Sequence, residues 1–114
     1  MYQYEARVER VVDGDTVDVS IDLGFDVWIK QRVRLARINA YESRTSDPVE
    51  KVKGLAAKKF VELNCPPGKI VHLNVLKCEG KYGRCIADVH TNGFGAESLN
   101  DLLVANAHAV YHAY

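Results

Sequence analysis

Residues 16–23 read Thr-Val-Asp-Val-Ser-Ile-Asp-Leu, so apolar and polar side chains alternate without interruption. The odd positions from Val17 to Leu23 are apolar, and the even positions are polar. A period of two predicts a β-strand with one buried face and one exposed face. Outward from this stretch, similar patterns predict strands at residues 3–12, 27–38, 69–77 and 84–91. In the strand at 27–38 we expect Val33 and Leu35 to point inward, with Arg32 and Arg34 on the opposite face.

Two other stretches change to a helical period. In residues 47–63 the apolar positions recur every three or four residues, which is typical of one helix face; they are Val49, Val52, Ala56, Phe60 and Leu63. Asp47 suits the N-cap, Pro48 the first helical position, and Glu50 would complete a capping box. A second helix is predicted from about Leu99 to Asn106, capped by Ser98. We expect Phe60 and Leu63 to lie in the core.

The order of these elements predicts the fold class. Three strands, a helix, two strands and a final helix in 114 residues fit one domain, residues 1–114. A mainly β, five-stranded OB-fold barrel with two helices matches this order best, and a split α+β sandwich is the alternative.

The charge balance is neutral overall but uneven along the chain. There are 15 Lys plus Arg against 15 Asp plus Glu, which argues against nucleic-acid binding by bulk charge alone. Residues 5–26 carry seven acids and two arginines, whereas residues 30–69 carry ten basic residues and four acids, a net +6. The neutral total therefore does not exclude local phosphate contacts at Arg34, Lys81 and Arg84.

The cysteines and the N-terminus bear on the compartment. Three cysteines (Cys65, Cys78 and Cys85) leave at least one free thiol, and we expect all of them to be free in a reducing compartment. The N-terminal residues lack the apolar core of a signal peptide, and no apolar run is long enough for a membrane span. We therefore expect a cytoplasmic protein, including the case of a phage- or prophage-encoded one, with no membrane partner.

Three polar clusters suggest chemistry. Asp13-Gly14-Asp15-Thr16 lies between the first two strands, where it is either a tight turn or a place for Asp15 to meet a hard cation. Residues 34–42 begin with Arg34, whose guanidinium suits phosphate oxygens, and include Asn39 and Glu42 just past the strand. A carboxylate there could activate water, although an alternating arginine strand is more often a solvated face.

The third cluster is Lys81-Tyr82-Gly83-Arg84, in the turn before the last strand. It is either a solvated hairpin or a turn that offers two cations and a phenol, with a glycine that allows close approach.

Together the three clusters resemble the staphylococcal nuclease (thermonuclease-like) family, whose pattern is Asp-Gly-Asp-Thr, then Arg-Leu before an Asp-x-Pro-Glu, then Lys-Tyr-Gly-Arg. The resemblance runs from about residue 5 to 112 and includes the segment Leu99–Val104. It implies an OB barrel and a nuclease that needs one divalent ion, typically Ca²⁺, and cuts DNA and RNA to leave 3′-phosphates.

The same resemblance implies roles for individual residues. Asp15 matches the first metal carboxylate, and Arg34 and Arg84 match the arginines that grip the scissile phosphate. Glu42 matches the carboxylate that activates water. Lys81 and Tyr82 match residues that hold a terminal phosphate.

The chain departs from the family pattern around the metal. Asn39 stands where the family has its second metal carboxylate, so we expect a weakened site in which the Ala40 backbone carbonyl still contributes. Tyr41 replaces a proline that would fix the loop before Glu42. Tyr111 either stacks on a base or packs at the barrel edge. We interpret His108 and His112, four residues apart, as ordinary histidines.

These observations predict a phosphodiesterase or endonuclease that acts on single-stranded DNA or RNA, or on nucleotides. The alternative is a catalytically weak or inactive OB module that binds nucleic acid or protein through the same face.

Overall fold

The computed structural model describes residues 2–43, 45–79 and 84–112. The strands are β1 (Tyr2–Asp13), β2 (Thr16–Asp22), β3 (Trp28–Leu35), β4 (Ile38–Ala40), β5 (Ile70–Glu79), β6 (Arg84–His90) and β7 (Ala109–Tyr111). The helices are α1 (Pro48–Asn64) and α2 (Leu99–Ala105).

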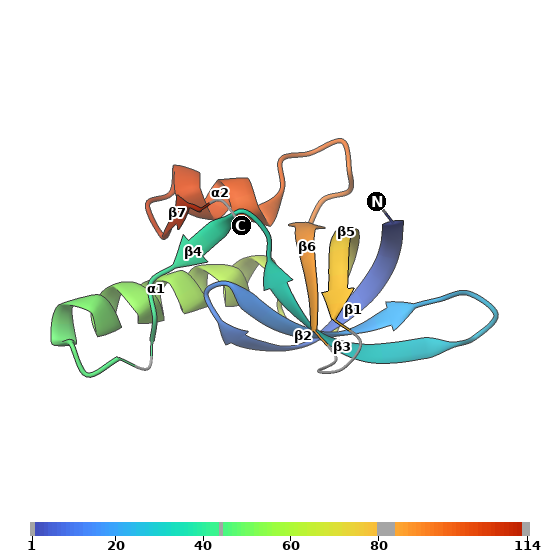
Figure 1. Ribbon diagram of the computed structural model, residues 1–114, viewed down its shortest axis with the longest axis horizontal. Helices are drawn as coiled ribbons and strands as arrows, with labels where there is room; N and C mark the ends of the chain where they lie inside the picture. Colours follow the sequence, from blue (N-terminus) through green and yellow to red (C-terminus); the bar gives the residue numbers. More distant parts are fainter. Residues whose placement is uncertain (1, 44, 80–83, 113–114) are drawn as a thin grey trace.

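Five strands close into a barrel in the order β1-β2-β3-β6-β5. All neighbours are antiparallel except β3 and β6, which are parallel. The two helices lie on one side of the molecule, and the β2–β3 hairpin extends away from them on the other (Figure 1). The predicted five-stranded OB-type barrel with two helices is therefore confirmed.

The alternation in β2 builds one wall of the core, as predicted. Val17, Val19 and Ile21 are almost fully buried, together with Val33 and Leu35 from β3. The prediction that Leu23 belongs to this buried face is wrong. Leu23 lies beyond the end of β2 in the projecting hairpin, where its side chain is 44% exposed.

The predicted single strand at residues 27–38 is divided into two. Arg37 adopts a positive φ of 66°, so the chain turns after β3 and continues as β4. Strand β4 pairs with β7 in a separate two-stranded sheet. The sequence pattern does not reveal this sheet because each of its strands has three residues.

Helix α1 has the predicted start but a different buried face. The Asp47 side chain accepts hydrogen bonds from the amides of Val49 and Glu50, which confirms the N-cap. The Asp47 amide donates to Thr45 Oγ1 at 3.2 Å and not to Glu50. The buried residues are Gly54, Ala57 and Val61.

The predicted apolar face of α1 is wrong in most positions. Val49, Val52 and Leu63 are 65%, 68% and 73% exposed, and Phe60 is only partly buried against the core. The helix lies so close to the rest of the fold that small side chains occupy the contact, and the larger apolar residues point outward.

The cysteines also differ from expectation. Cys78 and Cys85 form a disulfide, because the β5–β6 register places them directly opposite each other. Cys65 is free and buried, and that burial raises the pKa of its thiol to about 12. In the part of the chain that the structure describes, no helix has the length and apolar character needed to cross a membrane.

Candidate active site

The β1–β2 turn, the end of β3 and strand β4 meet at one end of the barrel. The Leu35 amide donates to the Asp15 carbonyl at 2.8 Å, and the Ala40 amide donates to Asp15 Oδ2 at 3.3 Å. Thr16 Oγ1 donates to the other carboxylate oxygen at 3.1 Å. The two side-chain bonds hold the Asp15 carboxylate between the start of β2 and the end of β4, which follows 25 residues after Asp15.

Arg34 joins the first two sequence clusters. Its Nη1 lies 2.7 Å from Asp15 Oδ2, and its Nη2 donates to Asn39 Oδ1 and, at 3.3 Å, to the Ile38 carbonyl. The side chains of Arg34 and Asp15 are 30% and 18% exposed. The guanidinium therefore bridges the two side chains that the family resemblance assigns to a metal ion.

A cleft of about 430 Å³ opens beside this bridge. We call it the carboxylate cleft, because four acidic residues line it together with Arg34, Asn39, Ala40 and Thr16; the acids are Asp13, Asp15, Glu42 and Glu50. The predicted water-activating carboxylate and the predicted metal residues thus face the same space.

The loop that carries Glu42 is fixed through its backbone. Ser43 is buried, and its Oγ donates to Asp13 Oδ1 at 3.0 Å. A Cβ placed on Gly54 of α1 would lie 2.1 Å from the Glu42 carbonyl oxygen and 2.5 Å from the Ser43 nitrogen. The absence of a side chain at position 54 therefore lets the helix support the Glu42 backbone directly. The Lys53 Nζ also lies 5.2 Å from the centre of the Tyr41 ring.

A second, smaller cleft of about 210 Å³ adjoins the first. We call it the arginine cleft, because Arg32, Arg34 and Arg84 line it with Val12, Asp13 and Thr16. The two clefts share Asp13, Thr16 and Arg34. Arg34 therefore separates a region rich in carboxylates from a region rich in guanidinium groups.

Arg84 is the least engaged of the three arginines. It is exposed at the start of β6, and its side chain makes no hydrogen bond or ion pair with any residue that the structure describes. Arg32 instead pairs with Asp18 at 2.9 Å, a contact that raises the pKa of the arginine. A free guanidinium beside a cleft can bind an incoming anion without first losing a partner.

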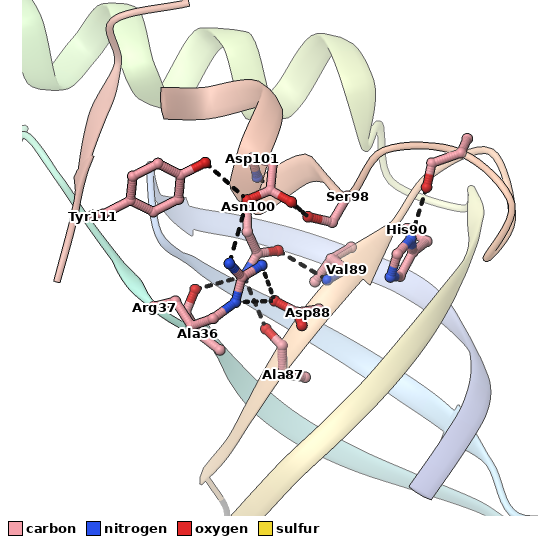
Figure 2. A network of polar contacts seen from close by, with 11 residues as sticks. Ala36, Arg37, Ala87, Asp88, Val89, His90, Ser98, Asn100, Asp101 and Tyr111 are labelled. Carbon is pink, nitrogen blue, oxygen red and sulfur yellow. Dashed lines mark hydrogen bonds and ion pairs between the residues drawn. The ribbon is translucent and has the colours of Figure 1, made fainter. Parts of the chain in front are cut away.

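Of the three predicted substrate-binding residues, the structure describes only Tyr111, which bonds to α2 and does not line either cleft. Lys81 and Tyr82 lie outside the described residues. The Tyr111 hydroxyl donates to Asp101 Oδ1 at 3.1 Å, which raises the pKa of the phenol, and the ring points toward α2 (Figure 2). His108 packs on Phe60 with ring centroids 4.8 Å apart.

The sequence did not predict a polar network that joins β6 and α2 (Figure 2). We call it the Arg37 network, and its side chains are those of Arg37, Asp88, Asn100 and Asp101. Arg37 pairs with Asp88 of β6 at 3.0 Å and with Asp101 of α2 at 3.4 Å. Fully buried Asn100 accepts from the Val89 amide at 3.0 Å and donates to the carbonyls of Ala36 and Ala87 at 2.8 and 3.2 Å. The only signal in the sequence was the Ser98–Asp101 cap, which is confirmed by the hydrogen bond from the Asp101 amide to Ser98 Oγ.

The donor set suits a hard cation, though only weakly. Asp15, Asn39 and the Ala40 carbonyl offer oxygen atoms, which Ca²⁺ and Mg²⁺ prefer. Only one of these three donors is an anion, and both side chains already contact Arg34. Within the described ranges, no group of three or more His, Cys, Asp or Glu side chains is arranged to hold a metal ion.

The fold and the site together define a small β-barrel whose arginine-lined and carboxylate-lined clefts adjoin at one end. A family model described as "Staphylococcal nuclease homologue" matches residues 32–114, which is more than half of the chain. The chain therefore belongs to the staphylococcal nuclease family. A comparison of the sequence with curated proteins gave no match. The family match begins in β3, and the fold itself brings Asp15 from the preceding hairpin to the site.

Proposed function

We propose that this protein is a nuclease that hydrolyses phosphodiester bonds of DNA, RNA or both, with one weakly bound divalent ion, Ca²⁺ in the first instance. The observation that carries the proposal is Arg34, which lies between the carboxylate cleft with Glu42 and the arginine cleft with Arg84. A phosphodiester bound there has guanidinium groups on one side and a carboxylate on the other.

The two arginines have complementary tasks in this proposal. Arg84 has no described partner, so it is available to bind a phosphate oxygen at once. Arg34 exchanges part of its contact with Asp15 and Asn39 for a second phosphate oxygen. Fixed positive groups lower the barrier because negative charge on the phosphoryl oxygens grows in the transition state.

Glu42 accepts the proton of the attacking water in the carboxylate cleft. Its backbone lies against Gly54, and the next residue, Ser43, is bonded to Asp13, so the side chain extends into the cleft from a fixed point of the chain. A general base acts when it lies within hydrogen-bond reach of the proton that it accepts. This is also the role that the family resemblance implies for Glu42.

A divalent ion would be held by Asp15, Asn39 and the Ala40 carbonyl. When bound, it supplies positive charge to the phosphate and helps to neutralise it. Because Asn39 brings no negative charge, we propose that the ion binds more weakly here than it would at a site with two carboxylates.

The test is digestion of single-stranded DNA and single-stranded RNA of the same sequence, with Ca²⁺ or with a chelator. Glu42→Gln and Arg84→Ala should each lower the Ca²⁺-dependent rate by about 10²–10³, since each removes one group that acts on the transition state. Glu62→Gln is the matched control, because Glu62 is an exposed residue of α1 outside both clefts.

Cleavage that depends on Ca²⁺ and on Glu42 and Arg84 supports the proposal. If the wild-type protein cleaves neither polymer above the level of these two variants, the nuclease proposal fails. Binding of the same polymers without cleavage would instead assign the chain to nucleic-acid binding alone.

A further inference from the structure

The outer face of β3 carries a row of side chains that leads into the arginine cleft. Trp28, Lys30, Arg32 and Arg34 occupy every second position of the strand, so they share one face, while Val33 and Leu35 point into the barrel. Successive members of such a row are about 6.6 Å apart along the strand. The row therefore places one aromatic and three cationic side chains along a line that ends at the candidate active site.

The arginine cleft brings two like charges side by side. In the parallel β3–β6 pair, Arg32 lies directly across from Arg84. Like charges opposite each other on neighbouring strands are destabilising. Asp18 compensates Arg32, with contacts of 2.9 and 3.3 Å, and Asp15 compensates Arg34. Asp13, which accepts a hydrogen bond from Ser43 Oγ, also lines the cleft, and Arg84 makes no ion pair with a described residue, so its guanidinium can contact an anion.

The row continues beyond Arg32 into a third hollow. This hollow, of about 410 Å³, lies over β1, β2 and β3, and Lys30, Arg10 and Arg32 line it. It shares Arg32 with the arginine cleft. The acids at its edge, Glu9 and Asp18, are already engaged by Ser20, by Arg7 and by the two arginines of the hollow. Hydrogen bonds from Ser20 and Arg7 lower the pKa of Glu9, so it stays ionised and limits the net charge.

Trp28 stands at the far end of the row. Its side chain is 45% exposed, and the Arg7 guanidinium carbon lies 5.4 Å from the centre of its ring. Exposed aromatic rings combined with a line of cations are the means by which proteins bind single strands, through base stacking and phosphate contacts.

We propose that Arg32, directly across from Arg84, forms a second phosphate subsite next to the candidate cleavage site, and that Lys30 and Trp28 extend it along β3. The ligand is a single-stranded polynucleotide. The inference rests on the proposed function in taking Arg34 and Glu42 as the centre of cleavage. It adds that the protein selects polynucleotides over mononucleotides, through contacts that a mononucleotide is too short to make.

The test compares binding of a fluorescent eight-nucleotide single strand of thymidines with binding of thymidine monophosphate, both with chelator so that no Ca²⁺-dependent cleavage occurs. Arg32→Gln should weaken binding of the oligonucleotide roughly tenfold, because one charge-assisted phosphate contact is lost. The slope of log affinity against log salt should fall by about 0.7, the value for one phosphate contact on a single strand. Affinity for thymidine monophosphate should stay within about twofold, which is the direct sign that Arg32 acts on a neighbouring phosphate.

Two further variants make the comparison specific. Trp28→Ala should weaken oligonucleotide binding at least fivefold, with little change in the salt slope, because stacking is lost and charge is not. Lys59→Gln, an exposed position on α1, removes the same charge as Arg32→Gln away from the row and should change neither affinity. Arg32→Gln leaves Asp18 with its second partner, Arg10, so we expect it to fold, which circular dichroism checks.

Each result decides for or against the subsite. If Arg32→Gln leaves oligonucleotide binding and its salt slope unchanged, or weakens both ligands equally, the second subsite is overturned. An observation that the wild type binds the oligonucleotide no better than thymidine monophosphate overturns it as well. These results are separate from cleavage: a protein that cleaves but ignores Arg32 keeps the proposed function and loses the subsite. One that needs Arg32 to bind the oligonucleotide but never cleaves keeps the subsite and loses the proposed function.

Discussion

Arg34 and Arg37 are three residues apart, and each contacts carboxylates, yet they belong to different parts of the molecule. Arg34 lies 2.7 Å from Asp15 beside an open cleft, whereas Arg37 pairs with Asp88 and Asp101 at 3.0 and 3.4 Å. Exposure does not separate the two, since their side chains are 30% and 45% exposed.

What separates them is what their partners do. Asp88 and Asp101 belong to β6 and α2, so Arg37 ties a helix to the barrel. Burial alone would lower the pKa of Arg37, but its bonds to the two carboxylates outweigh this and raise it. The partners of Arg34 line a cleft that also holds Glu42. An arginine's role therefore follows from the space beside its partners: those of Arg34 line an open cleft, whereas those of Arg37 join α2 to the barrel.

The largest effect is expected on stability, when the buried Asn100 side chain near Arg37 is removed. Asn100→Ala leaves the Val89 amide and the Ala36 carbonyl without their buried partner. We expect the free energy of unfolding to fall by about 2–4 kcal/mol, because unsatisfied buried groups are costly. Urea unfolding measures the loss. The rate of cleavage per folded molecule should be unchanged, and a variant that keeps its stability would show that the hydrogen bonds of Asn100 do not stabilise the fold.

The next largest effect is expected on the rate of cleavage, when the backbone of Glu42 is displaced. In Gly54→Ala the new methyl group overlaps the Glu42 carbonyl, so the loop and the helix must separate. A displacement of about 1 Å at a reacting group lowers rates by up to 10²-fold, and we expect a loss of that order. Kinetics on single-stranded DNA measures it. Gly95→Ala is the control, since a Cβ there meets nothing within 4 Å. Full activity in Gly54→Ala would mean that α1 does not position Glu42.

A smaller effect is expected on Ca²⁺ affinity, when a negative charge is added next to Arg34. Asn39→Asp adds a carboxylate beside Asp15, so we expect Ca²⁺ to bind about tenfold more tightly through the added Coulomb attraction. Calorimetric titration compares the variant with the wild type. An unchanged Ca²⁺ affinity would refute the proposal that Asn39 weakens the metal site.

The smallest expected effect is the acid response of the Arg37 network. Burial would raise the pKa of Asp101, but hydrogen bonds from Ser98, Tyr111 and Arg37 outweigh it and lower the pKa. Asp101 therefore contributes stability above the pKa of an unfolded aspartate, about 3.9, and this contribution is lost as the pH falls through the lower folded pKa.

Asp101→Asn should remove that pH dependence. Comparing urea unfolding at pH 6 and pH 3, we expect the variant to lose less stability on acidification than the wild type, by less than about 1 kcal/mol for a partly exposed group. Glu62→Gln, on the exposed side of α1, should behave like the wild type. Identical acid responses of Asp101→Asn and wild type would show that the network does not depend on this carboxylate.

Much of the barrel can be predicted from the sequence, because alternation in β2 and β3 is a local signal. Val17, Val19, Val33 and Leu35 lie in the core for that reason. Helix α1 could not be read in the same way. Its contact with the barrel depends on Gly54 and Ala57, whose small size is a requirement of the partner surface and not a hydrophobic pattern.

The candidate site also has features that the sequence predicts and features that it does not. Arg34, Asp15, Asn39 and Glu42 come together as the motif order suggested. The bond from Ser43 to Asp13 and the pairing of Arg32 with Arg84 depend on the register between distant segments, which no local pattern contains. The disulfide between Cys78 and Cys85 was missed for the same reason, since only the β5–β6 register places the two residues together.

Arg34→Gln and Arg37→Gln, compared side by side for kcat on single-stranded DNA and for the free energy of unfolding, test whether the two arginines have different roles. Arg34→Gln should lower kcat by about 10²–10³ and change stability by less than about 1 kcal/mol. Arg37→Gln should leave kcat within about twofold and lower stability by up to about 1 kcal/mol, because it removes two partly exposed ion pairs. If Arg37→Gln loses activity as strongly as Arg34→Gln, or if Arg34→Gln keeps full activity, the division between a chemical and a structural arginine is contradicted.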